Sequence, residues 1–347
     1  APAARPAALW GKGAVATTDD ASPDAPCTPG RETASSSVSS SSSISAIVAR
    51  GIAMEVATTL AETRREASAL TAGGSSSASS REDRAAAVEE YAHHEAHAGM
   101  ASLASFLRSK LAEEKEDATA TATERALLIG QTAHAIATDA EPELATMLAP
   151  RDAWGVGDET SRRFASGALG RRAGGKYGKA PKLSTAAQEQ LADATAALRA
   201  ARERGFKTWA VRVAADIGAA VSRSLASDDT VTSAELPAEW EEETVADAGG
   251  DMTLRLPSQP SPRVLDAMRA AADEATRVGG HLLPSAATHA LGAACARECA
   301  HVYDAFVKTT NAGGIGEKWT IQALFDVMTI TRVFVGAEDR GGGGGGG

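Results

Sequence analysis

The chain has 347 residues, a formal net charge of −10 and only 4% aromatic residues. The acidic balance argues against a nucleic-acid-binding protein, because no domain-wide positive field is present to attract phosphates. Three cysteines in so long a chain do not build a disulfide framework, and this favours a reducing compartment. No apolar run approaches the roughly 20 residues that span a bilayer, so we expect no transmembrane segment.

The first half of the chain alternates between helical stretches and segments without periodicity. Residues 1–43 are rich in Ala, Pro, Ser and Thr and are expected to be disordered, because little apolar surface is available to offset the entropy of ordering. The pattern predicts a helix over 44–70, a Gly/Ser linker over 71–80 and a longer helical segment over 81–149. Because the chain begins with Ala1 rather than methionine, we interpret it as a fragment or a trimmed gene model.

The second half is predicted to be a single helical bundle between two segments that do not fold. Residues 150–184 are Gly-rich and basic and are interpreted as a linker, and 337–347 end in a disordered glycine tail. The C-terminal helical bundle is predicted over 185–336, with 227–251 as an acidic loop. No strand is predicted anywhere. The predicted fold class is therefore all-α, with elongated helical bundles.

The clearest local pattern is a helix, a stop and a further helix. Ser261-Pro262 predicts an N-cap followed by proline at the first helical position. Gly279-Gly280 predicts the end of this helix, because glycine adopts the left-handed conformation without a steric cost. A further helix is predicted to begin at Pro284, and a last helix is predicted from Trp319 to Val335. Its stripe of Ile321, Leu324, Phe325 and Met328 is expected to pack inside the bundle.

One glycine-rich motif approaches a phosphate-binding loop. Gly170 to Tyr177 matches the G-x-x-x-x-G-K spacing, but Tyr177 stands where Ser or Thr must hold magnesium. A cluster of basic residues surrounds it, and its contact with anionic lipid or an acidic partner is kept as an alternative to simple solvation. The members of this cluster are Arg162, Arg163, Arg171, Arg172, Lys176, Lys179 and Lys182.

Two further groups of side chains could carry chemistry. His93 and His97 have the i, i+4 spacing of two metal ligands, but together with His94 they do not form H-E-x-x-H, so a solvated polar face is the preferred interpretation. Cys295 and Cys299 share a helical face with apolar residues and are interpreted as small core residues. No catalytic, cofactor-binding or metal-binding residue is therefore expected.

Residues 206–336 resemble subunit 1 of the conserved oligomeric Golgi complex, in particular its plant and algal forms. The segments that carry the resemblance, in order, are a Trp-bearing helix and the runs from Ala238 to Val245, Met252 to Ser261, Glu274 to His281 and Gly316 to Val327. The positions that we take as the signature of this resemblance are Trp209, Trp240, Pro257, Pro260, Arg277, Gly279, Gly280, His281, Leu324 and Phe325.

The resemblance implies a helical rod of the kind found in multisubunit tethering complexes. It implies a non-enzymatic peripheral protein on the cytosolic face of Golgi membranes, acting in vesicle tethering, intra-Golgi retrograde transport and Golgi organisation. The implied partners are the other subunits of the complex and, through the complex, SNAREs and Rab GTPases. A helical scaffold of another complex, or a metal- or nucleotide-dependent enzyme, remains the alternative.

Overall fold

The computed structural model of the chain describes residues 39–72, 78–116, 119–154, 183–232, 240–247, 250–310 and 315–334. The predicted glycine tail, most of the predicted linkers and most of the N-terminal segment that was predicted to be disordered lie outside these residues. So do Cys27, the Gly170–Tyr177 motif and the basic cluster around it. Within the described residues the chain is mostly helical, which confirms the all-α prediction at the level of fold class.

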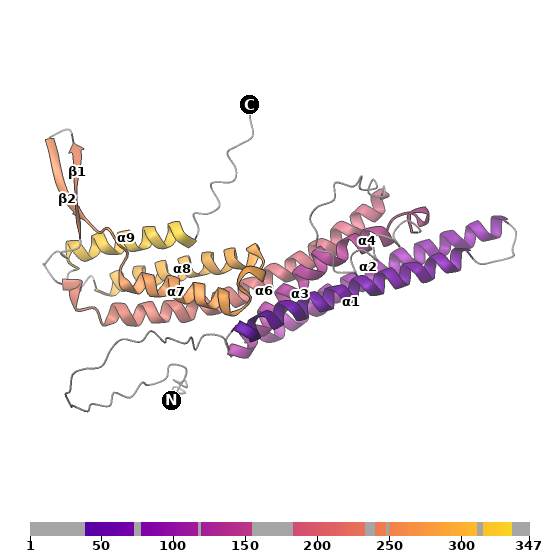
Figure 1. Cartoon of the computed structure of the whole chain (residues 1–347), viewed down its shortest axis with the longest axis horizontal. Coiled ribbons are helices and arrows are strands. Elements are labelled where there is room, and N and C mark those ends of the chain that lie inside the picture. The colour runs from indigo at the N-terminus through magenta and orange to yellow at the C-terminus, as the bar shows by residue number, and fades with distance from the viewer. Residues whose placement is uncertain are drawn as a thin grey trace, which may run out of the picture. The chain divides into compact units, whose positions relative to one another are not determined.

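The first half forms three long helices and a set of short ones (Figure 1). Ser39–Ser43 belong to the first helix, although the sequence pattern placed them in a disordered segment. The longest of these helices, the second one, begins at Ala78, three residues before its predicted start. The elements are α1 (Ser39–Ala72), α2 (Ala78–Glu116), α3 (Ala120–Ala135), the π-helix η1 (Ile136–Ala140), α4 (Glu141–Met147) and the 3₁₀ turn η2 (Arg151–Ala153).

The second half contains the longest helix of the described chain and three helices that follow it. Ser184 caps the start of α6 (Thr185–Ala226), because its side chain accepts a hydrogen bond from the Ala187 amide. The remaining elements are the 3₁₀ turn η3 (Asp229–Thr232), strands β1 (Glu241–Asp247) and β2 (Gly250–Leu256), α7 (Pro262–Arg277), the 3₁₀ turn η4 (Gly280–Leu282), α8 (Ser285–Thr310) and α9 (Glu317–Phe334).

The β1–β2 hairpin corrects the prediction that no strand is present and that 227–251 is a loop. The two strands pair antiparallel, and Glu242 lies opposite Arg255 with an ion pair at 2.6 Å. The signal was present in the sequence, since Met252, Leu254 and Leu256 alternate with polar residues. It was overlooked because the partner strand opens with three glutamates, which are unfavourable in strands.

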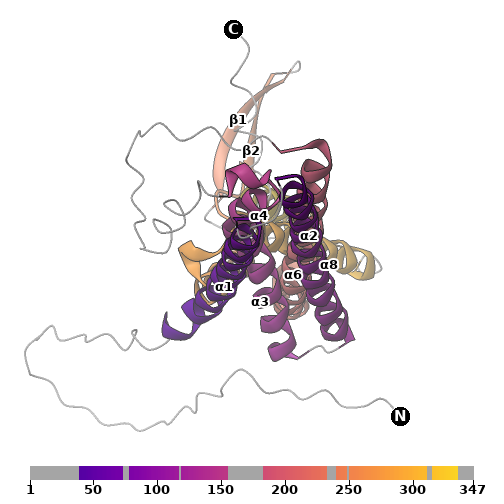
Figure 2. The same ribbon diagram turned by 90° about the vertical axis from the view of Figure 1, so that its right-hand side faces the viewer.

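Two hydrophobic cores lie along α6, and α6 contributes to both of them (Figure 1). The first core is formed by α1, α2, α3, α4 and the N-terminal half of α6, which Figure 2 views nearly along the helix axes. The second core is formed by the C-terminal half of α6 with α7, α8 and α9. The predicted division at residues 150–184 therefore does not separate the cores, because α6 joins them without a break.

The segment that begins the predicted linker is part of the first core. Trp154 is 4% exposed, and its indole N–H donates to the Ala149 carbonyl at 3.0 Å. The buried Arg64 guanidinium donates to the Trp154 carbonyl at 3.1 Å and pairs with Glu143 at 3.3 Å. The linker prediction placed Pro150–Trp154 outside the fold because its Gly-rich continuation lacks periodicity, whereas one tryptophan ties this segment to α1.

Two glycines bring α3 and α6 into close contact where the two cores meet. A Cβ atom on Gly205 would lie 2.8 Å from the Ala126 carbonyl oxygen and from the Gly130 backbone. A Cβ atom on Gly130 would lie 2.6 Å from the ring of Phe206. Only glycine fits this approach, so the helix-propensity cost of Gly205 is offset by helix–helix packing.

The predicted helix stop is confirmed in position and in mechanism. Gly279 and Gly280 have φ angles of 145° and 52°, and α7 ends two residues before the first of them. Pro262 occupies the first turn of α7 as predicted, and Ser261 precedes it. However, the Ser261 hydroxyl does not cap the helix. It binds a carboxylate of α9 instead, as described below.

Candidate functional site

Half of the apolar stripe of α9, which was predicted to pack inside the bundle, faces outward. Leu324 is 61% exposed and Met328 is 63% exposed, while Ile321 and Phe325 are partly buried at the edges of the stripe. These four residues are called the outer α9 stripe below. Because apolar residues recur all around α9, the stripe alone did not determine which face is buried.

The face of α9 that is buried carries a charged residue. Its buried members are Trp319, Asp326 and Ile330, which recur at helical spacing, and Asp326 is 1% exposed. Sequence reasoning missed Asp326, because an aspartate within an apolar helix is most often solvent-exposed. The prediction of internal packing is therefore wrong for Leu324 and Met328, whereas Phe325 is partly buried, and the reason is that the inward face is selected by a polar contact.

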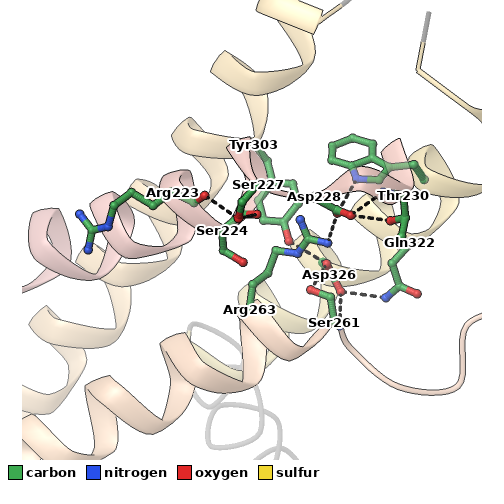
Figure 3. Close-up of polar contacts among 11 residues, drawn as sticks. Arg223, Ser224, Ser227, Asp228, Thr230, Ser261, Arg263, Tyr303, Gln322 and Asp326 are labelled. Carbon is green, nitrogen blue, oxygen red and sulfur yellow. Dashed lines mark hydrogen bonds and ion pairs between the residues drawn. The ribbon is translucent and has the colours of Figure 1, made fainter. Parts of the chain in front are cut away.

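Four hydrogen bonds hold the Asp326 carboxylate (Figure 3). The Ser261 amide donates at 2.8 Å and the Ser261 hydroxyl at 2.6 Å, both from the start of α7. The Tyr303 hydroxyl of α8 donates at 2.7 Å, and the Gln322 amide of α9 itself donates at 2.9 Å. A buried carboxylate is tolerated only when such donors replace its water. The network therefore fixes the rotation of α9 against α7 and α8.

The electrostatics of this network favour a structural role. Burial raises the pKa of the Tyr303 hydroxyl, and the neighbouring Asp326 carboxylate raises it further, because a phenolate would be desolvated and repelled there. Tyr303 therefore remains a donor throughout the physiological pH range. Asp326 has four donors and almost no exposed surface, so it is not presented to a substrate.

A second carboxylate, that of Asp228, lies just after the end of α6, in the same region as Asp326 (Figure 3). Asp228 forms a close ion pair with Arg263 and accepts from Thr230 and from the Trp319 indole N–H, the last at 3.4 Å. Burial alone would raise the pKa of Asp228, but the hydrogen bonds from Thr230 and Arg263 lower it overall. This cluster ties the end of α6 to α7 and to Trp319 at the beginning of α9.

Two of the signature residues, Trp209 and Arg277, bind the same carboxylate, that of Glu274. Trp209 is fully buried, and its indole N–H donates to Glu274 at 3.2 Å. Arg277 donates to the same carboxylate at 2.7 Å and reaches Glu124 of α3 at 2.8 Å. These contacts join α6, α7 and α3, so Trp209 and Arg277 have a structural part in connecting the two cores.

The remaining signature residues are not part of one site. Trp240 is 9% exposed and Pro257 is buried, on either side of the β1–β2 hairpin, while Pro260 is half-buried just before α7. His281 is exposed on η4, next to the two glycines. The ten residues therefore range from buried positions such as Trp209 to exposed ones such as His281 and Leu324, and they do not form one site.

The histidine cluster differs in part from its predicted environment. His94 is exposed, but His93 is half-buried, lies 3.3 Å from the Ala149 carbonyl and packs edge-on against Trp154. The prediction of a solvated face is thus wrong for His93, because Trp154 from a distant segment covers it. Among the described residues, no group of three or more His, Cys, Asp or Glu side chains is placed to hold a metal ion.

The two described cysteines are core residues, as predicted. Cys295 and Cys299 are fully buried in the second core and form no disulfide. Burial raises the pKa of Cys295 to about 12 and that of Cys299 to about 11. A thiol that does not ionise at neutral pH is a poor nucleophile and a poor metal ligand.

α1 has an unexpected composition. Its segment Ile44–Ala72 has a mean hydropathy of 1.4 over its most apolar window and is long enough to cross a membrane. Only 17% of that window is buried in the fold. The expectation that no segment is apolar enough to span a bilayer overlooked this helix, because its large apolar residues, such as Ile47, Ile52 and Leu60, are separated by small and polar residues and form no continuous run. One such helix is weak evidence for a membrane span.

No protein-family model, no curated protein and no solved structure matches this chain.

Proposed function

We propose that this chain is a non-enzymatic subunit of a vesicle-tethering complex that acts in retrograde intra-Golgi transport and Golgi organisation. The proposal places it on the cytosolic face of Golgi membranes, with the other subunits of the conserved oligomeric Golgi complex as partners. SNAREs and Rab GTPases would be reached through that complex. Its first support is the ordered resemblance of residues 206–336 to subunit 1 of this complex.

The observation that carries the proposal is the outer α9 stripe. The exposed Leu324 and Met328 lie one turn apart on the same face of α9, with the partly buried Ile321 on the preceding turn, and apolar residues at this spacing are typical of helix-on-helix interfaces. The Asp326 network holds α9 in the orientation that exposes the stripe. A surface that is fixed before binding loses less entropy on association than a mobile one. We therefore assign the stripe as a subunit contact.

Co-purification tests this assignment. The full chain, tagged and expressed in cells with an intact Golgi, is isolated with and without the paired changes Leu324→Gln and Met328→Gln. Glutamine keeps the helix propensity of both positions while removing their apolar surface. We expect the variant to recover at most about one tenth of the complex subunits, a loss of about 1.4 kcal/mol or more of binding free energy. Its melting temperature should be unchanged.

The matched control is Leu265→Gln, at an apolar position on α7 that is 45% exposed. This variant should recover the complex subunits as the wild type does. If the wild type recovers none of them, the tethering assignment fails. If it recovers a different and reproducible set of proteins through the same stripe, the chain is a helical scaffold of another complex.

A further inference from the structure

An open apolar groove runs between α1 and α2, on the first core and away from α9. It has a volume of about 840 Å³. Its floor contains the buried Leu60 and Met100, and its walls rise to the exposed Ile52, Leu70 and Tyr91. These residues and the small side chains between them define the α1–α2 groove. Nothing among the described residues fills it.

The length of the groove matches a helix. Its lining extends along α1 from Ile52 to Leu70, which at 1.5 Å per residue corresponds to about 27 Å. On α2 it extends over a similar distance, from Arg84 to Leu103. On both helices the lining positions recur every three to four residues, which is the spacing that accepts the side chains of a third helix between two others.

The charges along the groove are unequal. Three carboxylates, those of Glu55, Glu66 and Glu95, line it, against one guanidinium, that of Arg84. None of these four side chains forms an ion pair with another described residue. The groove therefore offers an apolar floor between acidic margins, with carboxylates that are free to pair with a ligand.

We propose that the α1–α2 groove binds an amphipathic helix of a partner protein, apolar on one face and rich in Lys or Arg along the flanks of that face. The apolar face covers the floor, and the basic flanks pair with Glu55, Glu66 and Glu95. A second copy of this chain is disfavoured, because it would bring the same carboxylates against each other. An anionic lipid surface is disfavoured for the same reason.

This site is independent of the outer α9 stripe. The two surfaces share no residue, belong to different cores and are tested by different variants, so the failure of one assignment leaves the other standing. A partner that joins both surfaces would bind more tightly than either contact alone, because the second contact becomes intramolecular.

A pair of matched glycines allows the groove to be blocked without disturbing the fold. Gly99 lines the groove, and a Cβ atom built on it meets no atom within 4 Å. Gly99→Leu therefore fills the groove. Gly51 on α1 is equally open but does not line the groove, so Gly51→Leu is the control. Both changes raise helix propensity, and neither is expected to lower the melting temperature.

The probe is a synthetic, fluorescently labelled helix of about 18 residues with leucines at positions a and d and lysines on both flanks. Its binding to the full chain is measured by fluorescence anisotropy, beside a peptide in which glutamate replaces every lysine. We expect the lysine peptide to bind at least about tenfold more tightly than the glutamate peptide. Gly99→Leu should weaken its binding at least about tenfold, whereas Gly51→Leu should not change it.

A charge reversal gives a second, independent readout. With Glu55→Lys, Glu66→Lys and Glu95→Lys together, the preference should invert toward the glutamate peptide, and both preferences should weaken as salt is added. Equal binding of the two peptides, or binding that survives Gly99→Leu, would overturn the proposal. So would a dimer of the wild-type chain that Gly99→Leu dissociates, or binding to phosphatidylcholine–phosphatidylserine vesicles that it abolishes.

Discussion

The two cores that share α6 are built from different side chains. Alanine supplies ten of the 19 buried residues of the first core, but seven of the 23 in the second, counted among the described residues. The second core contains Phe206, Trp209, Tyr303 and Trp319, whereas Trp154 is the one aromatic residue of the first. Alanine allows helices to lie close together but fills little space between them, and the open α1–α2 groove lies in the first core.

The difference in composition between the two cores bears on how the rotation of each helix about its axis is determined. An alanine face is similar at every position, so it fixes the distance between helices better than their rotation. Aromatic side chains with polar atoms need particular partners, and in the second core these are Asp228, Glu274 and Asp326. The second core therefore holds its helices in one arrangement through hydrogen bonds as well as through packing.

The largest expected effect comes from removing the central side chain of the aromatic core. Trp209→Ala should lower the free energy of unfolding by about 3–5 kcal/mol, because a fully buried indole is lost and Glu274 loses a donor. Urea denaturation of the purified chain measures this cost. A cost below that of Leu60→Ala in the alanine-rich core would contradict the view that the second core is held by hydrogen bonds of its aromatic residues as well as by packing.

A smaller effect is expected where the two cores meet. Gly205→Leu places a side chain against the Ala126 carbonyl and the Gly130 backbone, and it should cost about 1–3 kcal/mol through overpacking. Gly99→Leu, where no atom lies within 4 Å, is the matched change and should stabilise the chain slightly. The measurement is the pair of urea midpoints. Equal midpoints would show that α3 and α6 separate without cost, and that the cores are not coupled there.

The smallest effect is a pH dependence located in the first core. Burial lowers the pKa of His134, and Arg202 lowers it further, against the opposing effect of Asp139. Because the unfolded chain then binds the proton more readily than the folded one, stability is retained above the unfolded pKa of about 6.5 and falls as the pH decreases through it. His134→Gln should reduce the loss of melting temperature between about pH 7.5 and pH 5.5. An unchanged loss would place the acid-sensitive groups elsewhere.

Local signals in the sequence predicted much of the second half of the chain. The start of α7 at Pro262, its end before Gly279 and Gly280, and the burial of Cys295 and Cys299 all follow from short-range chemistry. The β1–β2 hairpin also has a local signal, since apolar and polar residues alternate along β2, but the polar composition of β1 does not predict a strand. Predictions of this kind succeed because a cap, a stop or a strand depends on neighbours within a few residues.

The candidate surfaces could not be predicted in the same way. Both faces of α9 carry apolar residues, so the choice between them depended on Asp326 meeting donors from Ser261 and Tyr303, which are 65 and 23 residues away. His93 is covered by Trp154 from a segment that was interpreted as a linker. Such contacts join distant parts of the chain, and the spacing of apolar residues within a single helix does not predict them.

By itself, then, the sequence determined that the chain is helical, acidic and interrupted at defined points, because helix propensity, charge and glycine stops are properties of short segments. Only the tertiary structure decided that α6 serves two cores, that the outer α9 stripe faces outward and that α1 and α2 leave a groove between them. Those features depend on which side chains from separate helices satisfy one another. A buried carboxylate must find its donors, and alanine faces leave unfilled whatever space their small side chains do not occupy.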